Sequence, residues 1–362
     1  MTTTVMPNYS ISKNSYEDLK EVLEIYKVKK IVIIGGKRAL ESASDYIFNS
    51  LKNSDVKILG KFIYGKECTM ENVNKLREKE EIKNCDLIFA VGGGKAIDTC
   101  KTLGLYEKKP VFSFPTISSN CSAATAIAVV YNNDGSMSHY EQTPAPLHMF
   151  INTKILVDAP YKYLHAGIGD GLSKQPEVLY VTENKDLDHS ASLGRAIASS
   201  CQKVFLKYGL DALNDCKNKN YDSDAILEIA LSIFVSTGYV SNLTNKENYY
   251  YNSSIAHLFY NASNVIKRDK EYLHGDVVAF GVLVLHEFFN NDEEFDRILN
   301  FNKSVSLPTS LKDVGIKEDD LKQMADVAVG MNEWNNCPVE ISKQKFINSI
   351  KRADEKGKSL NK

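Results

Sequence analysis

The sequence predicts an α/β domain over residues 1–160 followed by an all-helical domain over residues 161–362. Short β-branched runs alternate with helical patterns in the first part, which is typical of a mostly parallel sheet. After Pro160 the segments become long and helical in period, and strand patterns are nearly absent. A length of 362 residues also suits about two domains.

The first domain is expected to contain four strands, the first of them a buried strand that ends in glycines. They are KKIVIIGG (29–36), DVKILGKF (55–62), CDLIFAVGGG (85–94) and KPVFSFP (109–115). Two further β-prone stretches, 125–132 and 154–159, are expected to close the domain, with a polar excursion from the sheet between them. Open parallel sheets bind ligands at the carboxyl ends of their strands. We therefore expect the reactive cleft where the helical half covers those ends.

The helical domain is expected to hold helices over 189–209, 222–241 and 253–266, and one that opens at Gly275. The longest apolar run, 277–285, is interpreted as a buried helix, since no segment is judged long enough to span a membrane. The N-terminus lacks the apolar core of a signal peptide.

Composition argues against several classes of partner. The formal net charge is −2 and no Lys/Arg block stands out, so neither nucleic acid nor a membrane surface is expected as a partner. The seven cysteines have no CxxC spacing, and their number is odd. A reducing compartment, and hence a cytoplasmic protein, is the simplest interpretation.

Three consecutive glycines, Gly92, Gly93 and Gly94, end one predicted strand and open a helix. Without Cβ atoms they permit positive φ and let a ligand approach the backbone. The N–H groups of the helix start suit a pyrophosphate, and Lys95 could add positive charge. A plain strand-to-helix turn is the alternative, because the GxGxxG fingerprint is absent.

A second polar loop, FPTISSN (114–120), follows the next strand. Thr116 and Ser119 are among its short donors and acceptors, which suit the phosphate or amide of a cofactor. On this segment alone, an ordinary polar loop is the favoured interpretation.

One carboxylate and two histidines are candidates for a divalent-metal site. Asp170 lies among glycines where the chain enters the helical half, and His257 and His274 lie on later helical segments. Such a set with one open position is a reasonable catalytic metal site, although a single buried histidine is more often a core residue. Position 174, one turn after Asp170, is lysine, so no fourth ligand is expected there.

Taken together, these motifs resemble the iron-containing alcohol dehydrogenase superfamily, and within it the glycerol-dehydrogenase-like branch. The resemblance lies in GGGKAIDTCK, FPTISSNCSAATAIAVVYN, GIGD at 167–170, His257, and HGDVVAFG at 274–281. It implies a Rossmann-like nucleotide domain followed by a helical metal domain, the architecture also of dehydroquinate synthase. It further implies reversible hydride transfer between a small alcohol or hydroxy acid and NAD or NADP. A homo-oligomer is expected.

The resemblance also assigns residues to roles. It implies a dinucleotide site lined by Gly92, Gly93, Gly94, Lys95, Asp98, Thr116 and Ser119. It implies that Asp170, His257 and His274 hold zinc or iron. A metal there would act as a Lewis acid on the substrate oxygen.

The sequence departs from the family pattern in three places. Cys121 stands where glycerol dehydrogenases have an Asp beside the substrate, which favours a 2-oxo acid or a simple aldehyde, unless the thiol only packs. Gly36 replaces the acid that bonds the adenine ribose, which with Lys37 and Arg38 favours NADPH. Gln175 and Pro176 replace two aromatics, so the substrate pocket is expected to be reshaped.

The alternatives share this architecture. One is an sn-glycerol-1-phosphate dehydrogenase or a dehydroquinate synthase-like enzyme, both of which need basic residues around the metal. The other is a non-catalytic relic that still binds metal or nucleotide.

Overall fold

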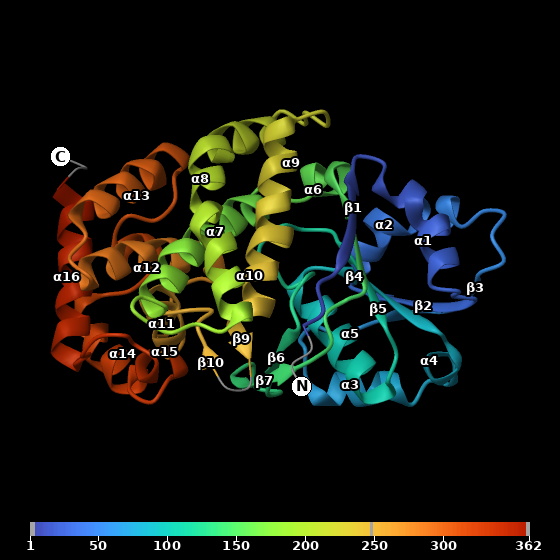
Figure 1. Cartoon of the computed structure of the whole chain (residues 1–362), viewed down its shortest axis with the longest axis horizontal. Coiled ribbons are helices and arrows are strands. Elements are labelled where there is room, and N and C mark those ends of the chain that lie inside the picture. The colour runs from blue at the N-terminus through green and yellow to red at the C-terminus, as the bar shows by residue number, and fades with distance from the viewer. Residues whose placement is uncertain (1–3, 247–248, 360–362) are drawn as a thin grey trace. The chain divides into compact units, whose positions relative to one another are not determined.

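The computed structural model describes residues 4–246 and 249–359, and Cα proximity divides the chain into two units (Figure 1). The first unit comprises Met1–Tyr161 and Asp215–Asn242. The second comprises Lys162–Asn214 and Leu243–Lys362. The first contains a parallel sheet and the second is almost wholly helical, so the predicted fold class is confirmed.

The first unit is built on a six-stranded sheet in which every pairing is parallel and the strand order is β1-β8-β5-β4-β2-β3. The strands are β1 Asn8–Ser12, β2 Lys30–Gly35, β3 Lys57–Ile63, β4 Leu87–Gly92, β5 Val111–Pro115 and β8 His148–Asn152. A separate antiparallel hairpin joins β6 Ile127–Tyr131 to β7 Met137–Gln142. Parallel strands need crossover connections, and helices supply them here.

The helices of this unit include α1 Leu19–Ile25, α2 Lys37–Ser50, α3 Met70–Arg77, α4 Glu80–Asn84, α5 Gly94–Glu107, α6 Thr153–Asp158 and α9 Asp224–Leu231. A short 3₁₀ helix, Ser15–Asp18, precedes α1. A π-helical turn, Ser232–Ser236, joins α9 to α10 Thr237–Thr244. In Figure 1, α1 and α2 lie on one side of the sheet and α3, α4 and α5 on the other.

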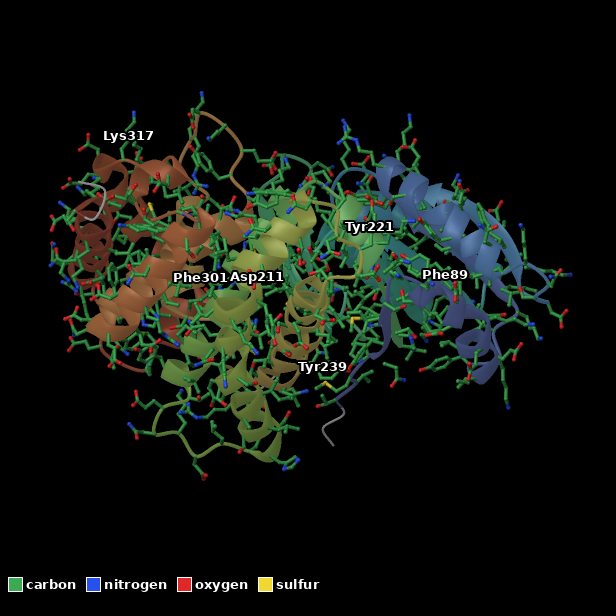
Figure 2. All side chains as sticks on the ribbon, turned by 90° about the horizontal axis from the view of Figure 1, so that it is seen from above. Phe89, Asp211, Tyr221, Tyr239, Phe301 and Lys317 are labelled. Atoms are coloured by element: carbon green, nitrogen blue, oxygen red, sulfur yellow. The ribbon has the colours of Figure 1, made fainter. Side chains whose placement is uncertain are left out.

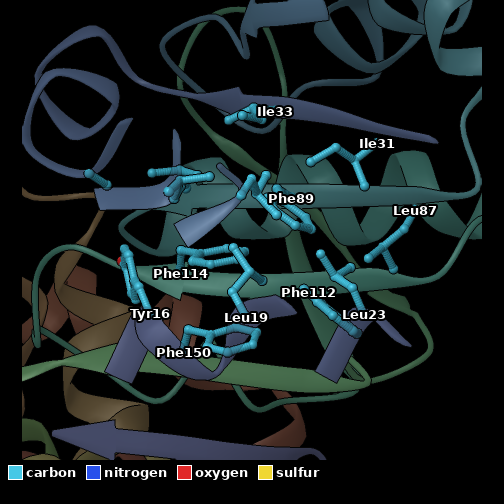
Figure 3. Close-up of a cluster of buried hydrophobic side chains, with 14 of the residues drawn as sticks. Tyr16, Leu19, Leu23, Ile31, Ile33, Leu87, Phe89, Phe112, Phe114 and Phe150 are labelled. Carbon is cyan, nitrogen blue, oxygen red and sulfur yellow. The ribbon is translucent and has the colours of Figure 1, made fainter. Parts of the chain in front are cut away.

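One face of the sheet forms an aromatic core with α1 and α2. Phe89, Phe112, Phe114 and Phe150 come from three adjacent strands and pack together, as Figure 3 shows. The rings of Phe114 and Phe150 are stacked with centroids 5.1 Å apart. Buried on both faces, β4 and β5 consist of almost continuous apolar runs, which is why the sequence indicated these two strands clearly.

Two expectations about the sheet are wrong. The β-prone stretch 154–159 is helix α6, because the side chain of Asn152 accepts a hydrogen bond from the Ile155 N–H at 3.1 Å and caps a helix there. The strand at this place is β8, which ends at Asn152, and its edge partner β1 was not expected either. The stretch 125–132 does form a strand, but it pairs within the hairpin rather than the main sheet.

A domain boundary at residue 160 would place residues 215–242 in the helical domain. In the structure these residues cluster with the first unit instead. The Tyr221 hydroxyl donates to Asp158 at 2.8 Å, and the Tyr239 hydroxyl donates to the carbonyl of Pro7 at 2.5 Å; both tyrosines are labelled in Figure 2. Helical periodicity indicates that a segment is a helix, but it does not indicate which neighbour the helix packs on.

One helical stretch corrects the expectation that no segment reaches transmembrane length. Among the described residues, Asp224–Thr244 is long and apolar enough by composition, with a mean hydropathy of 1.4 over its best window. About two thirds of that window is buried inside the protein (67%), as in a core helix.

The second unit is a helical bundle around α12 His274–Phe288. Its other helices are α7 Lys162–Val181, α8 His189–Lys217, α11 Ile255–Ser263, α13 Asp292–Val305, α14 Leu321–Ala328, α15 Asn332–Asn335 and α16 Lys343–Ser359. Short 3₁₀ helices span Leu311–Val314 and Glu318–Asp320, and two-residue strands β9 Asn245–Lys246 and β10 Tyr249–Tyr250 pair with each other. Every residue of 277–285 is buried, so the interpretation of this run as a buried helix is confirmed.

Candidate functional site

The helices α7 and α12 touch through two glycines. A Cβ added at Gly169 would lie 2.4 Å from the carbonyl oxygen of Gly275, and one added at Gly275 would lie 1.7 Å from the carbonyl oxygen of Ala166. Real Cβ contacts are never so short, so only glycine allows the two backbones to approach this closely. Asp170 and His274, the neighbours of these glycines, are brought together as a result.

A third helix, α11, meets α12 in the same way. A Cβ at Gly281 would lie 2.5 Å from the carbonyl oxygen of Ala256. Ala256 directly precedes His257, so this close approach places the His257 ring beside α12.

The three predicted metal-binding residues form one cluster. Their ligand atoms all lie within 4.8 Å of one another. The Asp170 Oδ1 atom is 3.1 Å from His274 Nε2 and 3.5 Å from His257 Nε2. Atoms that bind one zinc ion at about 2.1 Å with tetrahedral angles lie about 3.4 Å apart. One carboxylate oxygen and two imidazole nitrogens at this spacing therefore fit a divalent cation.

Charges around the cluster are strongly coupled. Burial raises the pKa of Asp170, but the neighbouring rings of His274 and His257 outweigh it and hold that pKa well below its usual range. Burial lowers the pKa of His257, but Glu177 and Asp170 outweigh it and raise the pKa to about 10. In the metal-free protein a proton on His257 thus offsets part of the negative charge of Asp170 and Glu177, and a bound cation would replace that proton.

Neighbouring side chains fix the orientation of the rings. The Tyr260 ring packs edge-on against His274, with centroids 4.2 Å apart. Glu177 is fully buried and its Oε2 atom is 2.6 Å from His257 Nδ1. Burial raises the pKa of Glu177, but the charges of His257 and Lys174 outweigh it and lower the pKa overall.

Sequence reasoning missed Glu177, and it considered Lys174 as a position without a fourth ligand and as an isolated basic residue near the metal candidates. Lys174 follows Asp170 by four residues and Glu177 follows it by seven, so both lie on the face of α7 that carries Asp170. This helical spacing was the available signal that they lie near Asp170. The Lys174 ammonium donates to the side-chain oxygen of Asn252 at 2.7 Å and to its backbone carbonyl at 3.2 Å. Lys174 is therefore held within the protein.

Pro176 lies inside helix α7, the helix-interior position that the sequence indicated for it. The side-chain oxygen of Gln175 accepts a hydrogen bond from the backbone N–H of Gln202 at 3.1 Å, which fastens α7 to α8. Gln175 thus forms a helix–helix contact in the second unit.

In the first unit, the predicted cofactor residues gather at the carboxyl ends of β2, β4 and β5. Gly92 ends β4 with φ +150°, Gly93 is the N-cap of α5, and Gly94 is its first residue. Gly36 is the N-cap of α2, at the end of β2. The N-termini of α2 and α5 therefore open on the same edge of the sheet.

The loops after β4 and β5 lie against each other. The Thr116 N–H donates to the carbonyl oxygen of Gly92 at 3.1 Å. A Cβ at Gly93 would lie 2.5 Å from the Ile117 side chain. Glycine at this position therefore makes room for the second loop, in which Ser119 is half-buried.

Two residues of GGGKAIDTCK (92–101) make contacts with other parts of the first unit. Lys95 is half-exposed and forms an ion pair with Glu67. Asp98 is buried: its Oδ1 accepts from the Ser122 hydroxyl at 2.7 Å and its Oδ2 from the Val129 N–H at 3.1 Å. Asp98 thus fastens the segment that follows the second loop instead of displaying its carboxylate at the edge.

Lys101 completes this anchor and was not singled out as a functional residue. Its side chain is fully buried and its ammonium is 2.9 Å from Asp98 Oδ1. It also donates to the carbonyl oxygens of Ser122 at 3.0 Å, Thr125 at 3.2 Å and Ile127 at 2.5 Å. Cys121, which is half-buried, directly precedes residues 122–127, the segment that Asp98 and Lys101 fasten.

We expect Lys101→Met to destabilise the first unit by about 3–5 kcal/mol, because the carboxylate of Asp98 would remain buried without its counter-charge. The unfolding midpoint in urea reports the loss. The double variant Lys101→Met with Asp98→Asn is the control and should regain a large part of the stability, since the remaining polar group is neutral. Equal stability of the single and double variants would contradict a buried ion pair.

A glycine-rich helix start in one unit and an Asp–His–His cluster in the other are the parts expected of a metal-dependent, nucleotide-linked oxidoreductase. A family model described as iron-containing alcohol dehydrogenase matches residues 7–149. The chain is 28% identical over 373 residues to a glycerol dehydrogenase of Thermotoga maritima, with 99% of this chain and 98% of that protein covered.

Two other relatives agree with this match. Hydroxycarboxylate dehydrogenase A of Escherichia coli is 27% identical over 322 residues, with 88% of this chain and 86% of that protein covered. The crystal structure of a probable glycerol dehydrogenase from Sinorhizobium meliloti superposes with a TM-score of 0.86 at 25% identity, covering 99% of this chain and 100% of that one. Residues 7–149 thus match the iron-containing alcohol dehydrogenase family model, and nearly the whole chain is similar to glycerol dehydrogenases, in agreement with the resemblance that its motifs indicated.

Proposed function

We propose that this protein is a metal-dependent, NAD(P)-linked oxidoreductase that interconverts a small alcohol or hydroxy acid with its carbonyl form. The observation that carries the proposal is the spacing of Asp170, His257 and His274, whose ligand atoms lie within 4.8 Å of one another. Similarity to glycerol and hydroxycarboxylate dehydrogenases over most of the chain supports the reaction class.

Each part of the proposed site has a physical task. When bound, zinc or iron would polarise the substrate oxygen, and the nicotinamide would exchange a hydride with the substrate carbon. Asp170 would supply the charged ligand of such an ion, and His257 and His274 would supply imidazole nitrogens. The glycine loop and the start of α5 would hold the pyrophosphate through backbone N–H groups.

For the substrate, we propose a 2-oxo acid or a simple aldehyde in preference to glycerone. Cys121 carries no charge where glycerol dehydrogenases have an Asp, so an anionic substrate would meet no repulsion there. For the cofactor, we propose that NADPH is accepted, because Gly36 offers no carboxylate against the extra phosphate.

The decisive experiment is reductase activity of metal-stripped protein reconstituted with zinc or with iron. NADH and NADPH would be tested separately against glycerone, simple aldehydes and 2-oxo acids. We expect turnover that depends on the metal and is faster with 2-oxo acids than with glycerone. Preference for glycerone, or an unchanged profile in Cys121→Asp, would contradict the proposed substrate class.

The alternatives would give other results in the same assay. Bound nucleotide without turnover of any carbonyl would indicate a relic or a phosphorylated substrate. A phosphorylated substrate is disfavoured because it would need free basic residues near the metal. Lys174, the basic residue closest in sequence to Asp170, is buried and donates to Asn252. We further propose that the protein is cytoplasmic and forms a homo-oligomer. Light scattering of the purified protein would test the oligomeric state.

A further inference from the structure

Glu177 makes three hydrogen bonds although its side chain has no exposed surface. Its Oε1 atom accepts from the backbone N–H groups of Ser254 at 2.8 Å and His257 at 2.9 Å. Its Oε2 atom is 2.6 Å from the Nδ1 atom of the His257 ring. A fully buried carboxylate is costly unless its oxygens are satisfied, and these contacts satisfy both.

The two backbone contacts cap helix α11. Ser254 is the N-cap of α11, and its own side chain makes no capping bond. The carboxylate of Glu177, a residue of α7, caps α11 in place of the Ser254 side chain. Its negative charge is favourable at the N-terminus of a helix. The cap fixes where α11 begins and therefore fixes the backbone of His257.

The third contact decides which nitrogen of His257 carries the proton. An ionised carboxylate can only accept a hydrogen bond, so the Nδ1 atom must be the donor. In the neutral ring the Nε2 atom then keeps its lone pair. This Nε2 atom is the one that lies 3.5 Å from Asp170 Oδ1, inside the Asp–His–His cluster.

We infer that Glu177 is a positioning residue that locks the tautomer and the ring orientation of His257, so that Nε2 is presented to the cation. The inference rests on the proposed function, because it assumes that a cation binds at Asp170, His257 and His274. Carboxylates in this position orient histidine ligands and raise their basicity.

Glu177→Gln separates this role from helix capping. The amide oxygen of the glutamine can still accept from the two backbone N–H groups. Its NH₂ group would face the Nδ1–H of His257, and two donors cannot form a hydrogen bond with each other. We expect the affinity of the metal-free protein for Zn²⁺, measured by competition with a chromophoric chelator, to fall by about 10–100-fold. The visible spectrum of the Co²⁺-substituted protein should also change.

Glu333→Gln is the matched control. Glu333 is also buried and accepts from the Ser253 hydroxyl at 3.0 Å and the Asn261 amide at 3.2 Å, around the same helix. Its variant should keep the Zn²⁺ affinity of the wild type. Equal Zn²⁺ affinities for wild type and Glu177→Gln would overturn the inference, as would equal losses in the two variants.

A direct measurement covers the case in which Glu177→Gln does not fold. Long-range ¹H–¹⁵N spectra of zinc-loaded wild-type protein labelled at histidine should show His257 as the Nδ1–H tautomer, and the opposite tautomer would overturn the inference. Failure of the proposed function looks different: wild-type protein would then bind no Zn²⁺ at the cluster, and Asp170→Asn would not alter its Zn²⁺ binding.

Discussion

Replacing Asp170 with asparagine is expected to lower kcat/KM by at least about 1,000-fold, and to leave the purified protein nearly free of zinc and iron. The side chain keeps its size, but the cluster loses its one anionic ligand, which faces His274 at 3.1 Å and His257 at 3.5 Å. A Lewis acid supplies several kcal/mol of charge stabilisation in the transition state, and each 1.4 kcal/mol corresponds to about tenfold in rate. Elemental analysis and steady-state kinetics together measure the effect.

Asp276→Asn is the matched control. Asp276 lies two residues beyond His274 on α12, but its carboxylate is 2.9 Å from His165 Nδ1 and takes no part in the cluster. Its variant should keep its metal and most of its activity. If both variants retained full activity with stoichiometric metal, the cation would have to bind elsewhere in the protein.

The sheet shows what sequence pattern can and cannot predict. The strands β2, β4 and β5 are apolar runs closed by glycine or proline, and the residues themselves predict them. Strand β1, NYSIS, is an edge strand with mostly exposed side chains, so it carries no such run. Helix α6 contains Ile155 and Val157, which favour strands, whereas the cap at Asn152 favours a helix.

The site shows a similar limit. Asp170, His257 and His274 are separated by up to 104 residues, so their spacing alone could not assemble them, and the family resemblance was needed. Glu177 and Lys101 were missed because each acts through a partner distant in sequence, His257 in one case and the 122–127 segment in the other. The spacing along α7 places Glu177 on the face that carries Asp170, but the contact with His257 follows from packing and cannot be inferred from that spacing.

Gly275→Ala should strongly disrupt the second unit, although Gly275 is not itself a ligand residue. The added Cβ would lie 1.7 Å from the Ala166 carbonyl oxygen and 3.0 Å from the Asp170 nitrogen. Both are backbone atoms in the middle of α7, so no side chain can turn away to make room. The two helices must separate, and we expect a loss of more than about 3 kcal/mol in stability, the upper end of ordinary overpacking.

Separation of the helices would also pull His274 away from Asp170, so metal content and activity should fall along with the unfolding midpoint. Gly330→Ala is the comparison: this glycine has φ +96° and open space where the Cβ would be, so only backbone strain of about 1 kcal/mol is expected. Its metal content should match the wild type. A Gly275→Ala protein that kept its metal and its unfolding midpoint would show that α7 and α12 do not touch at these glycines, and the packing account of the cluster would fail with it.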